Sequence, residues 1–186
     1  MWGGLALAVA ALLSLLAAPA TAVMPAVDVQ GGRATTAHEV AVARSATQDF
    51  THPPAAKKAG YALLKDAKGI ACIAMKGMGG MGIHYADGAL VDGRIRLRHP
   101  EALVYRFTFN GHLRLSALEY LVTREAWRAH HPTGRPALFG HRFNLTPAGN
   151  RFGLPAYFSL HAWVWDKNPA GKFAPFNPDV HCPPGV

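Results

Sequence analysis

The stretch Ala102–Thr123, ALVYRFTFNGHLRLSALEYLVT, decides the fold of this chain. Two apolar runs, Ala102–Phe109 and Leu113–Thr123, flank the dipeptide Asn110-Gly111. Asn-Gly supplies the positive φ values of a type I′ turn, whose twist matches that of paired strands. The stretch therefore predicts two long antiparallel strands joined by a hairpin.

Similar apolar runs occur on both sides of this hairpin, and helical patterns precede them. Because helices come first and strands follow, the predicted fold class is α+β: N-terminal helices followed by a curved, mainly antiparallel sheet. From Asp166 on, Pro and Gly interrupt every pattern, so the tail is expected to be coil. Expected helices cover Thr35–Phe50, with Thr35 or Thr36 as N-cap, Ala55–Leu64, and Arg124–His131 as a short helix or turn; further strands cover Ile70–Ala74, Met81–Ala86 and Ala156–Trp165.

The N-terminus has the pattern of a secretory signal peptide. Leu5–Leu16 is an almost uninterrupted run of Leu, Ala and Val, and it is shorter than the about 20 residues of a membrane span. Ala20 and Ala22 fit the small-residue rule for cleavage. We therefore expect a signal peptide at 1–22, a flexible segment at 23–33, a single α+β domain at 34–186, and a secreted or periplasmic protein without a membrane span in its mature form.

The formal net charge of the chain is +8. Its Lys and Arg residues are spread thinly, at the alternating spacing of solvated strand faces, and they form no helical basic stripe of the kind that binds nucleic acid. Nucleic acid is therefore not an expected partner. Weak attraction to anionic cell-envelope surfaces is the alternative to a plain solubilising surface.

The chain has two cysteines, Cys72 and Cys182. An even pair in an oxidising compartment predicts a disulfide, which here would close a loop of roughly 110 residues and tie down the Pro- and Gly-rich tail. The alternative, a thiol nucleophile, lacks an activating base nearby in the sequence.

Three ionisable residues interrupt runs that otherwise look buried: His84, Glu119 and His161, each in a predicted strand. Burying an ionised carboxylate away from water costs about 3–5 kcal/mol unless a partner compensates the charge. We therefore predict that the three share one polar pocket. The alternative is three separately satisfied residues, for instance His84 bonded to backbone and Glu119 paired with an Arg.

A pocket of this composition could support two kinds of chemistry. Two imidazoles and a carboxylate suit Fe(II), Zn(II) or Mn(II), so His84, Glu119 and His161 are the candidate metal ligands of a small-molecule site or a metal-dependent enzyme. Without a metal, Glu119 would be a general base with His161 as its catalytic partner. The expected ligand-binding surroundings are aromatic: Tyr85, Tyr120, Trp163 and Trp165, of which Tyr120 falls opposite Glu119 by strand alternation unless a bulge intervenes.

Two alternatives compete with this site. Met75, Met78, Met81 and His84 follow one another at three-residue spacing in a Gly-rich loop, and thioether sulfur suits Cu(I), so a periplasmic copper-binding protein is one alternative. The other is a structural or envelope-associated module without catalysis, in which the Trp-containing strand forms an interaction surface.

Seven segments of the mature chain carry a resemblance to known proteins: Gly69–Ile73, Gly80–Tyr85, Pro100–Tyr105, Leu118–Tyr120, Leu138–Gly140, Leu160–Trp165 and the tail from Asn168 through Asn177-Pro178 to Cys182. In these segments the chain resembles a family of secreted bacterial proteins of uncharacterised function. The resemblance implies the paired cysteines and the positions of His84, Glu119 and His161 as shared features, and it implies no reaction or substrate. His141 stands where Gln is usual in that family, which makes an essential role for it unexpected.

Overall fold

The computed structural model describes residues 29–186, with side chains from Thr36 on. The expected signal peptide at 1–22 lies outside the described residues, as does most of the segment 23–33. Among the described helices none is both long and apolar enough to cross a membrane. The described chain forms helices first and a sheet afterwards, which confirms the predicted fold class.

The first helix, α1 (Val29–Thr47), begins earlier than predicted, so neither Thr35 nor Thr36 is its N-cap. Thr36 instead donates a hydrogen bond from its hydroxyl to the Phe139 carbonyl, 3.2 Å away. The turn η1 (Gln48–Phe50) and the short helix α2 (Pro53–Lys58) follow.

The second predicted helix is wrong beyond Lys58, because residues 62–63 form the edge strand β1 (Ala62–Leu63). Later in the chain, α3 (Arg124–His130) forms as predicted, with the Thr123 side chain accepting a hydrogen bond from the Ala126 amide. A short turn, η2 (Gly88–Leu90), lies between two of the strands.

The main sheet has seven strands in the order β1-β3-β4-β5-β9-β8, with β2 also paired to β3, and all pairs among the described strands are antiparallel. No regular element follows β9 among the described residues, which confirms the coil tail from Asp166. Besides β1, three short strands were not predicted: β6 and β7, which form a separate ribbon, and β8. The remaining bounds are β2 (Cys72–Met75), β3 (Gly79–Ala86), β4 (Ala102–Phe107), β5 (Leu113–Thr123), β6 (Ala137–Leu138), β7 (His141–Arg142), β8 (Asn144–Thr146) and β9 (Tyr157–Ala162).

The predicted hairpin forms between β4 and β5, but its turn is not type I′. Gly111 has a φ of +75°, whereas Asn110 does not have the positive φ that a type I′ turn requires. The Gly111 amide donates to the Thr108 carbonyl, and the Thr108 amide donates to the His112 carbonyl. This is the pattern of a longer hairpin loop that ends in a left-handed glycine.

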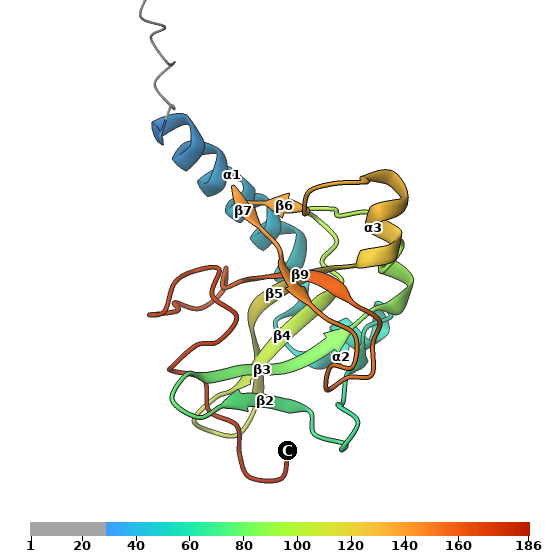
Figure 1. Ribbon diagram of the computed structural model, residues 1–186. Coiled ribbons are helices and arrows are strands. Elements are labelled where there is room, and N and C mark those ends of the chain that lie inside the picture. The colour runs from blue at the N-terminus through green and yellow to red at the C-terminus, as the bar shows by residue number, and fades with distance from the viewer. Residues whose placement is uncertain (1–28) are drawn as a thin grey trace, which may run out of the picture.

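Strand alternation gives the sheet two faces with different coverings. One face carries Leu103, Tyr105 and Leu118 and packs against Ala43 of α1 and Ala56 of α2, forming the main hydrophobic core. In Figure 1 these helices lie behind the sheet. The other face turns toward the viewer and is covered by the loop before β9 and by the C-terminal tail, so it has room for a cavity.

The predicted disulfide is present. Cys72 at the start of β2 is bonded to Cys182 near the chain end, across a sequence separation of 110 residues. The Cys72 amide also donates to the carbonyl of Val186, so the last residues are attached to the sheet twice. The disulfide therefore anchors the end of the tail on the core side of β2, while Pro175 and Phe176 earlier in the tail line the cavity.

Candidate metal centre

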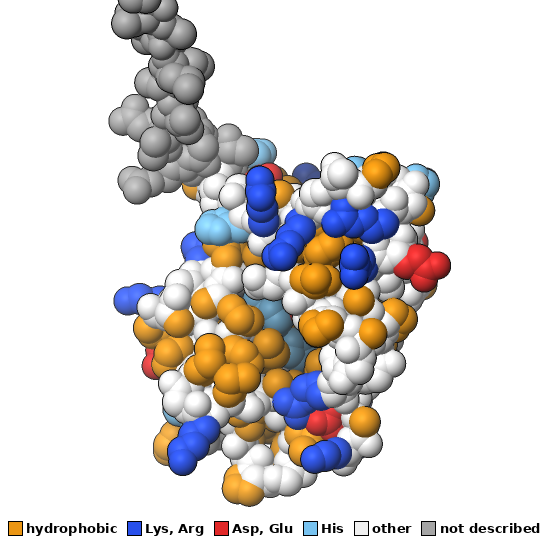
Figure 2. Space-filling view, in the orientation of Figure 1, with side chains coloured by type: hydrophobic (Ala, Val, Ile, Leu, Met, Phe, Trp, Pro, Cys, Tyr) orange, Lys and Arg blue, Asp and Glu red, His pale blue; other side chains and the backbone are white. Residues whose placement is uncertain are grey.

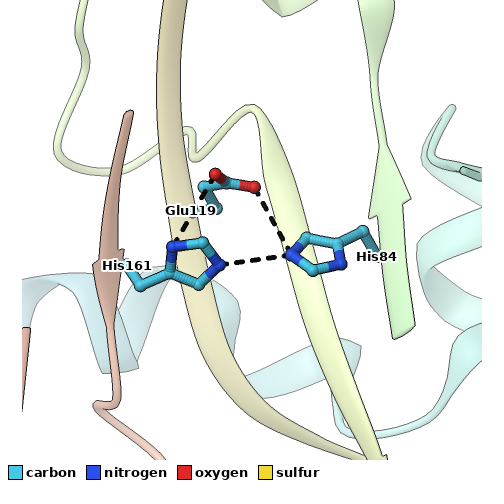
Figure 3. A group of neighbouring side chains, drawn as sticks. All are labelled: His84, Glu119 and His161. Carbon is cyan, nitrogen blue, oxygen red and sulfur yellow. Dashed lines mark hydrogen bonds and ion pairs between the residues drawn. The ribbon is translucent and has the colours of Figure 1, made fainter. Parts of the chain in front are cut away.

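The register of four neighbouring strands brings His84, Glu119 and His161 together. Glu119 on β5 is directly opposite His161 on β9, and it is opposite Ala102 on β4 in the other direction. His84 on β3 is opposite Val104 on β4, two residues along from Ala102, and its side chain reaches diagonally across β4 toward Glu119 (Figure 3). The sequence prediction that the three residues share one pocket is confirmed.

The three side chains surround a common centre. The Nε2 atoms of His84 and His161 lie 3.2 Å apart, and their rings are nearly perpendicular. Glu119 places Oε2 at 3.5 Å from His84 Nε2 and Oε1 at 3.7 Å from His161 Nδ1. One ligand atom from each residue can be chosen so that all three lie within 4.8 Å of one another, which is a group that could hold a metal ion.

Burial keeps both histidines neutral. Each is 3% exposed, and loss of hydration lowers the pKa of His84 and of His161 to about 4. For His84 the negative charge of Glu119 opposes this shift without reversing it. Burial also raises the pKa of Glu119, against the opposing effects of His84 and the Ser159 side chain. At neutral pH both imidazoles are therefore uncharged, the form that metal coordination requires, and a hydrogen bond joins their Nε2 atoms.

Gly82 positions His84 through a close backbone approach. Its φ is +101°, and a Cβ at this position would collide with the carbonyl oxygen of Tyr105 on β4. The Gly82 backbone also lies near enough to His84 to favour its protonated form, but within residues 36–186 no group has hydrogen-bond geometry with the buried Nδ1 atom. The glycine therefore lets β3 approach β4 closely two residues before the ligand.

The cluster lies in the wall of a cavity of about 420 Å³. In Figure 2 a hollow near the centre of the view has histidine at its floor and hydrophobic side chains around it. Arg151 also lines the cavity, but its guanidinium is ion-paired with the buried carboxylate of Asp66 at 2.6 Å. The cavity therefore gives a small molecule access to the cluster through a mainly apolar entrance.

Two of the aromatic residues predicted to surround the site, Tyr85 and Tyr120, lie on the opposite face of the sheet. Tyr85 packs edge-on against Tyr105 in the main core, and Tyr120 donates from its hydroxyl to the Leu97 carbonyl at 2.8 Å. Each is the immediate neighbour of a cluster residue, so strand alternation turns it away. A bulge beside Tyr120 could have turned its side chain toward the cavity, but the irregularity in the pairing of β4 with β5 lies elsewhere, at the step from Val104 to Tyr105.

The two predicted tryptophans are also separate from the cavity, because β9 ends at Ala162 and regular alternation ends with it. Trp163 packs in a second buried cluster with Val180 and donates from Nε1 to the Ala174 carbonyl at 2.7 Å. Trp165 donates from Nε1 to the Thr47 hydroxyl of α1 at 3.1 Å. Both side chains hold other segments in place.

The structure divides the methionines predicted to bind copper. Met75 and Met81 line the same cavity as His84, whereas Met78 does not line it and is 45% exposed. The full set of three thioethers and one imidazole is therefore not assembled in this structure.

Sequence reasoning missed Glu101, a buried carboxyl that directly precedes β4. It is 1% exposed, and burial raises its pKa to about 8. Its Oε2 accepts a hydrogen bond from the Leu121 amide at 2.9 Å, while Oε1 has no partner among residues 36–186. In the sequence, Glu101 stands between Pro100 and an apolar strand, and a carboxylate at that position is usually solvated, so the sequence did not indicate its burial.

Comparison with known proteins adds no name to this site. No family model, no curated protein and no solved structure matches the chain. The family resemblance described above therefore stays a prediction, and function has to be argued from the site itself.

Proposed function

We propose that this protein binds one divalent transition-metal ion between His84, Glu119 and His161 and presents it to a small molecule that enters the adjoining cavity. The observation that carries the proposal is the convergence of these three buried side chains on one centre. Fe(II), Zn(II) and Mn(II) are the ions that this set of ligands suits.

The two histidines share a hydrogen bond between their Nε2 atoms, whereas the contacts of Glu119 with them fit a shared ion better than direct hydrogen bonds. The contacts of Glu119 with the two histidines are 3.5 and 3.7 Å, beyond the about 2.7–3.2 Å of ordinary hydrogen bonds. Metal–ligand bonds of roughly 2.0–2.2 Å place neighbouring ligand atoms about 3.0–3.6 Å apart. The separations of His84 Nε2 from its two neighbours, 3.2 and 3.5 Å, fall within that range.

The charges in the cluster also favour a cation. The two neutral histidines do not balance an ionised Glu119, and Arg151 is already paired with Asp66. A divalent ion would balance the carboxylate and use the lone pairs of both imidazoles. A bound ion of this kind polarises a coordinated ligand or lowers the pKa of a coordinated water, which would make the site suitable for hydrolytic or oxidative chemistry.

The test is metal binding by protein purified without a His tag and freed of metal by a chelator. We expect titration calorimetry to show one equivalent of Zn(II) or Mn(II), and anaerobic Fe(II) to compete for the same site. The variants H84A and H161A should lose at least about 100-fold in affinity, because each removes a ligand from a three-residue set.

The matched control is H99A, which changes an exposed histidine outside the cluster. It should bind like the parent, and circular dichroism should show that all variants fold. Failure of Zn(II), Mn(II) and Fe(II) to bind, or equal affinity in H84A and the parent, would overturn the proposal.

Copper binding is a second candidate, favoured by the two thioethers in the same cavity as His84. Met75 and Met81 could supply soft sulfur ligands to Cu(I). In this case the double variant M75L/M81L should lose Cu(I) binding and keep Zn(II) binding. Unchanged Cu(I) affinity in that variant would remove the candidate.

Secretion belongs to the same proposal. The Cys72–Cys182 disulfide supports it, because such bonds persist in oxidising compartments. Expression of the full chain in a bacterium, followed by N-terminal sequencing of the periplasmic fraction, tests it. A mature protein that begins near Val23 is the expected result.

A further inference from the structure

A second cavity, of about 400 Å³, adjoins the candidate metal centre. It lies on the same face of the sheet, toward the edge strand β1. Leu64, Leu121, Leu154 and Tyr157 line both cavities, and so does Glu119. The carboxylate-bearing residue therefore borders two compartments, one of which also contains the histidine pair.

A row of alanines forms the floor of this second cavity. Ala62 on β1 is opposite Ala86 on β3, Ala86 is opposite Ala102 on β4, and Ala102 is opposite Glu119 on β5. All four residues line the cavity. Three successive cross-strand positions thus carry only methyl groups, and the resulting hollow leads from the exposed edge at Ala62 to the carboxylate.

The lining determines what the cavity can hold. Its walls are mainly aliphatic, with Leu63 and Val91 at one side and Leu154 and Pro155 at another. The described residues that line it include no basic side chain, and its two carboxyl groups, Glu101 and Glu119, have pKa values that burial raises. An anionic group is therefore unfavourable there, and an apolar group is favoured because it removes aliphatic surface from water.

We propose that the alanine-floored cavity binds the apolar arm of a small molecule whose oxygen-donor group reaches the metal centre beside Glu119. The inference rests on the proposed function for the donor group, while the binding of the arm requires no metal. The cavity is large enough for an arm the size of a single ring or a short branched chain. The ligand class is thus a small amphipathic molecule, uncharged along its apolar part.

The first measurement uses Zn(II)-loaded protein and two hydroxamates, which share one metal-binding group. Acetohydroxamate has no arm, and phenylacetohydroxamate carries a ring. We expect the ring to lower the dissociation constant at least about tenfold, the change expected from burying part of an apolar group. Equal dissociation constants for the two compounds would overturn the inference.

The matched variants fill the cavity or leave it unchanged. A86L places a larger side chain on the cavity floor, and A62L does the same at the exposed end, where folding is least at risk. Both should abolish the advantage of the ring and leave acetohydroxamate binding unchanged. A129L, on the exposed surface of α3, should behave like the parent. An advantage that persists in both A86L and A62L would contradict the inference.

The second measurement separates this inference from metal binding. Metal-free protein is titrated with 2-phenylethanol and, in parallel, with phenylacetate, while backbone amide resonances are followed by NMR. We expect 2-phenylethanol to shift the amides of Ala86, Ala102 and Leu121. Phenylacetate should shift them far less, because no described lining residue is basic and its carboxylate would lose hydration without a partner. If these shifts appear but Zn(II) does not bind, the proposed function fails and the arm site stands. If Zn(II) binds but neither the shifts nor the ring advantage appear, the arm site fails alone.

Discussion

The substitution E101Q should stabilise the protein increasingly as the pH rises. Burial raises the pKa of Glu101 to about 8 from an ordinary value of 4.5. Glutamine has nearly the same shape, and its amide oxygen can still accept the hydrogen bond that the Leu121 amide donates to Glu101 Oε2. The substitution therefore removes the ionisable group and keeps the contact.

The sign and size of the effect follow from the raised pKa of Glu101. The protonated carboxyl favours the folded state fully below pH 4.5, and this contribution is lost as the pH rises through about 8. A shift from 4.5 to about 8 at 1.36 kcal/mol per pH unit corresponds to roughly 5 kcal/mol once the pH exceeds the folded-state pKa. At pH 7 the expected gain of E101Q over the parent is about 3 kcal/mol, and near pH 4.5 it approaches zero.

The assay is urea unfolding of the metal-free parent and E101Q at half-unit steps from pH 4.5 to pH 8.5. His84 and His161 also titrate between the folded and unfolded states, but they do so in both proteins, so the difference between the two curves isolates Glu101. E125Q, which changes an exposed carboxyl of α3, should show no such trend. A difference between parent and E101Q that does not grow with pH would refute the reasoning.

Three further predictions concern the disulfide, the metal and the backbone. Removing both Cys72 and Cys182 by alanine substitution should lower the free energy of unfolding by about 4–5 kcal/mol, as a closed loop of this size implies, and an unchanged urea midpoint would contradict it. At a pH below the raised pKa of Glu119, each Zn(II) ion that binds should displace one proton from this carboxyl and none from the histidines. Calorimetry in buffers of different ionisation enthalpy counts the released protons, and a count of two per ion would contradict this prediction. The variant G82A should lose at least about 2 kcal/mol of stability and bind Zn(II) more weakly, because its methyl group would collide with the Tyr105 carbonyl and shift β3. Thermal unfolding like that of the parent would show that the close approach of β3 to β4 is not needed.

The sequence predicted the cluster because burial and strand alternation are local properties. His84, Glu119 and His161 are polar residues at positions that strand periodicity assigns to covered faces, and such residues need partners. Their distances could not be predicted, since these depend on register. The decisive feature is the register across β4, where His84 is opposite Val104 and Glu119 is opposite Ala102, and nothing in the local sequence marks this pairing.

The predicted aromatic surroundings show where local reasoning ends. Tyr85 and Tyr120 were assigned by their nearness in sequence to the cluster, although period-two alternation places immediate neighbours on opposite faces. Trp163 and Trp165 did share a parity with His161, but β9 ends at Ala162, and the chain beyond it turns to meet α1 and the tail. Alternation is reliable only while the strand continues, and strand ends are the least predictable feature of a sequence.

The two faces of the sheet explain why the candidate site is where it is. One face is packed against helices and large aromatic side chains of the main core, so it contributes stability. Among the described residues, the loop before β9 and the tail cover the other face, and the Cys72–Cys182 disulfide attaches the tail to the sheet. Small residues along this loosely covered face leave two adjoining cavities, and ionisable residues occur where these cavities meet. A ligand of the helix-covered core would have to displace packed side chains, whereas a ligand of this face needs only the space that the alanine row already leaves.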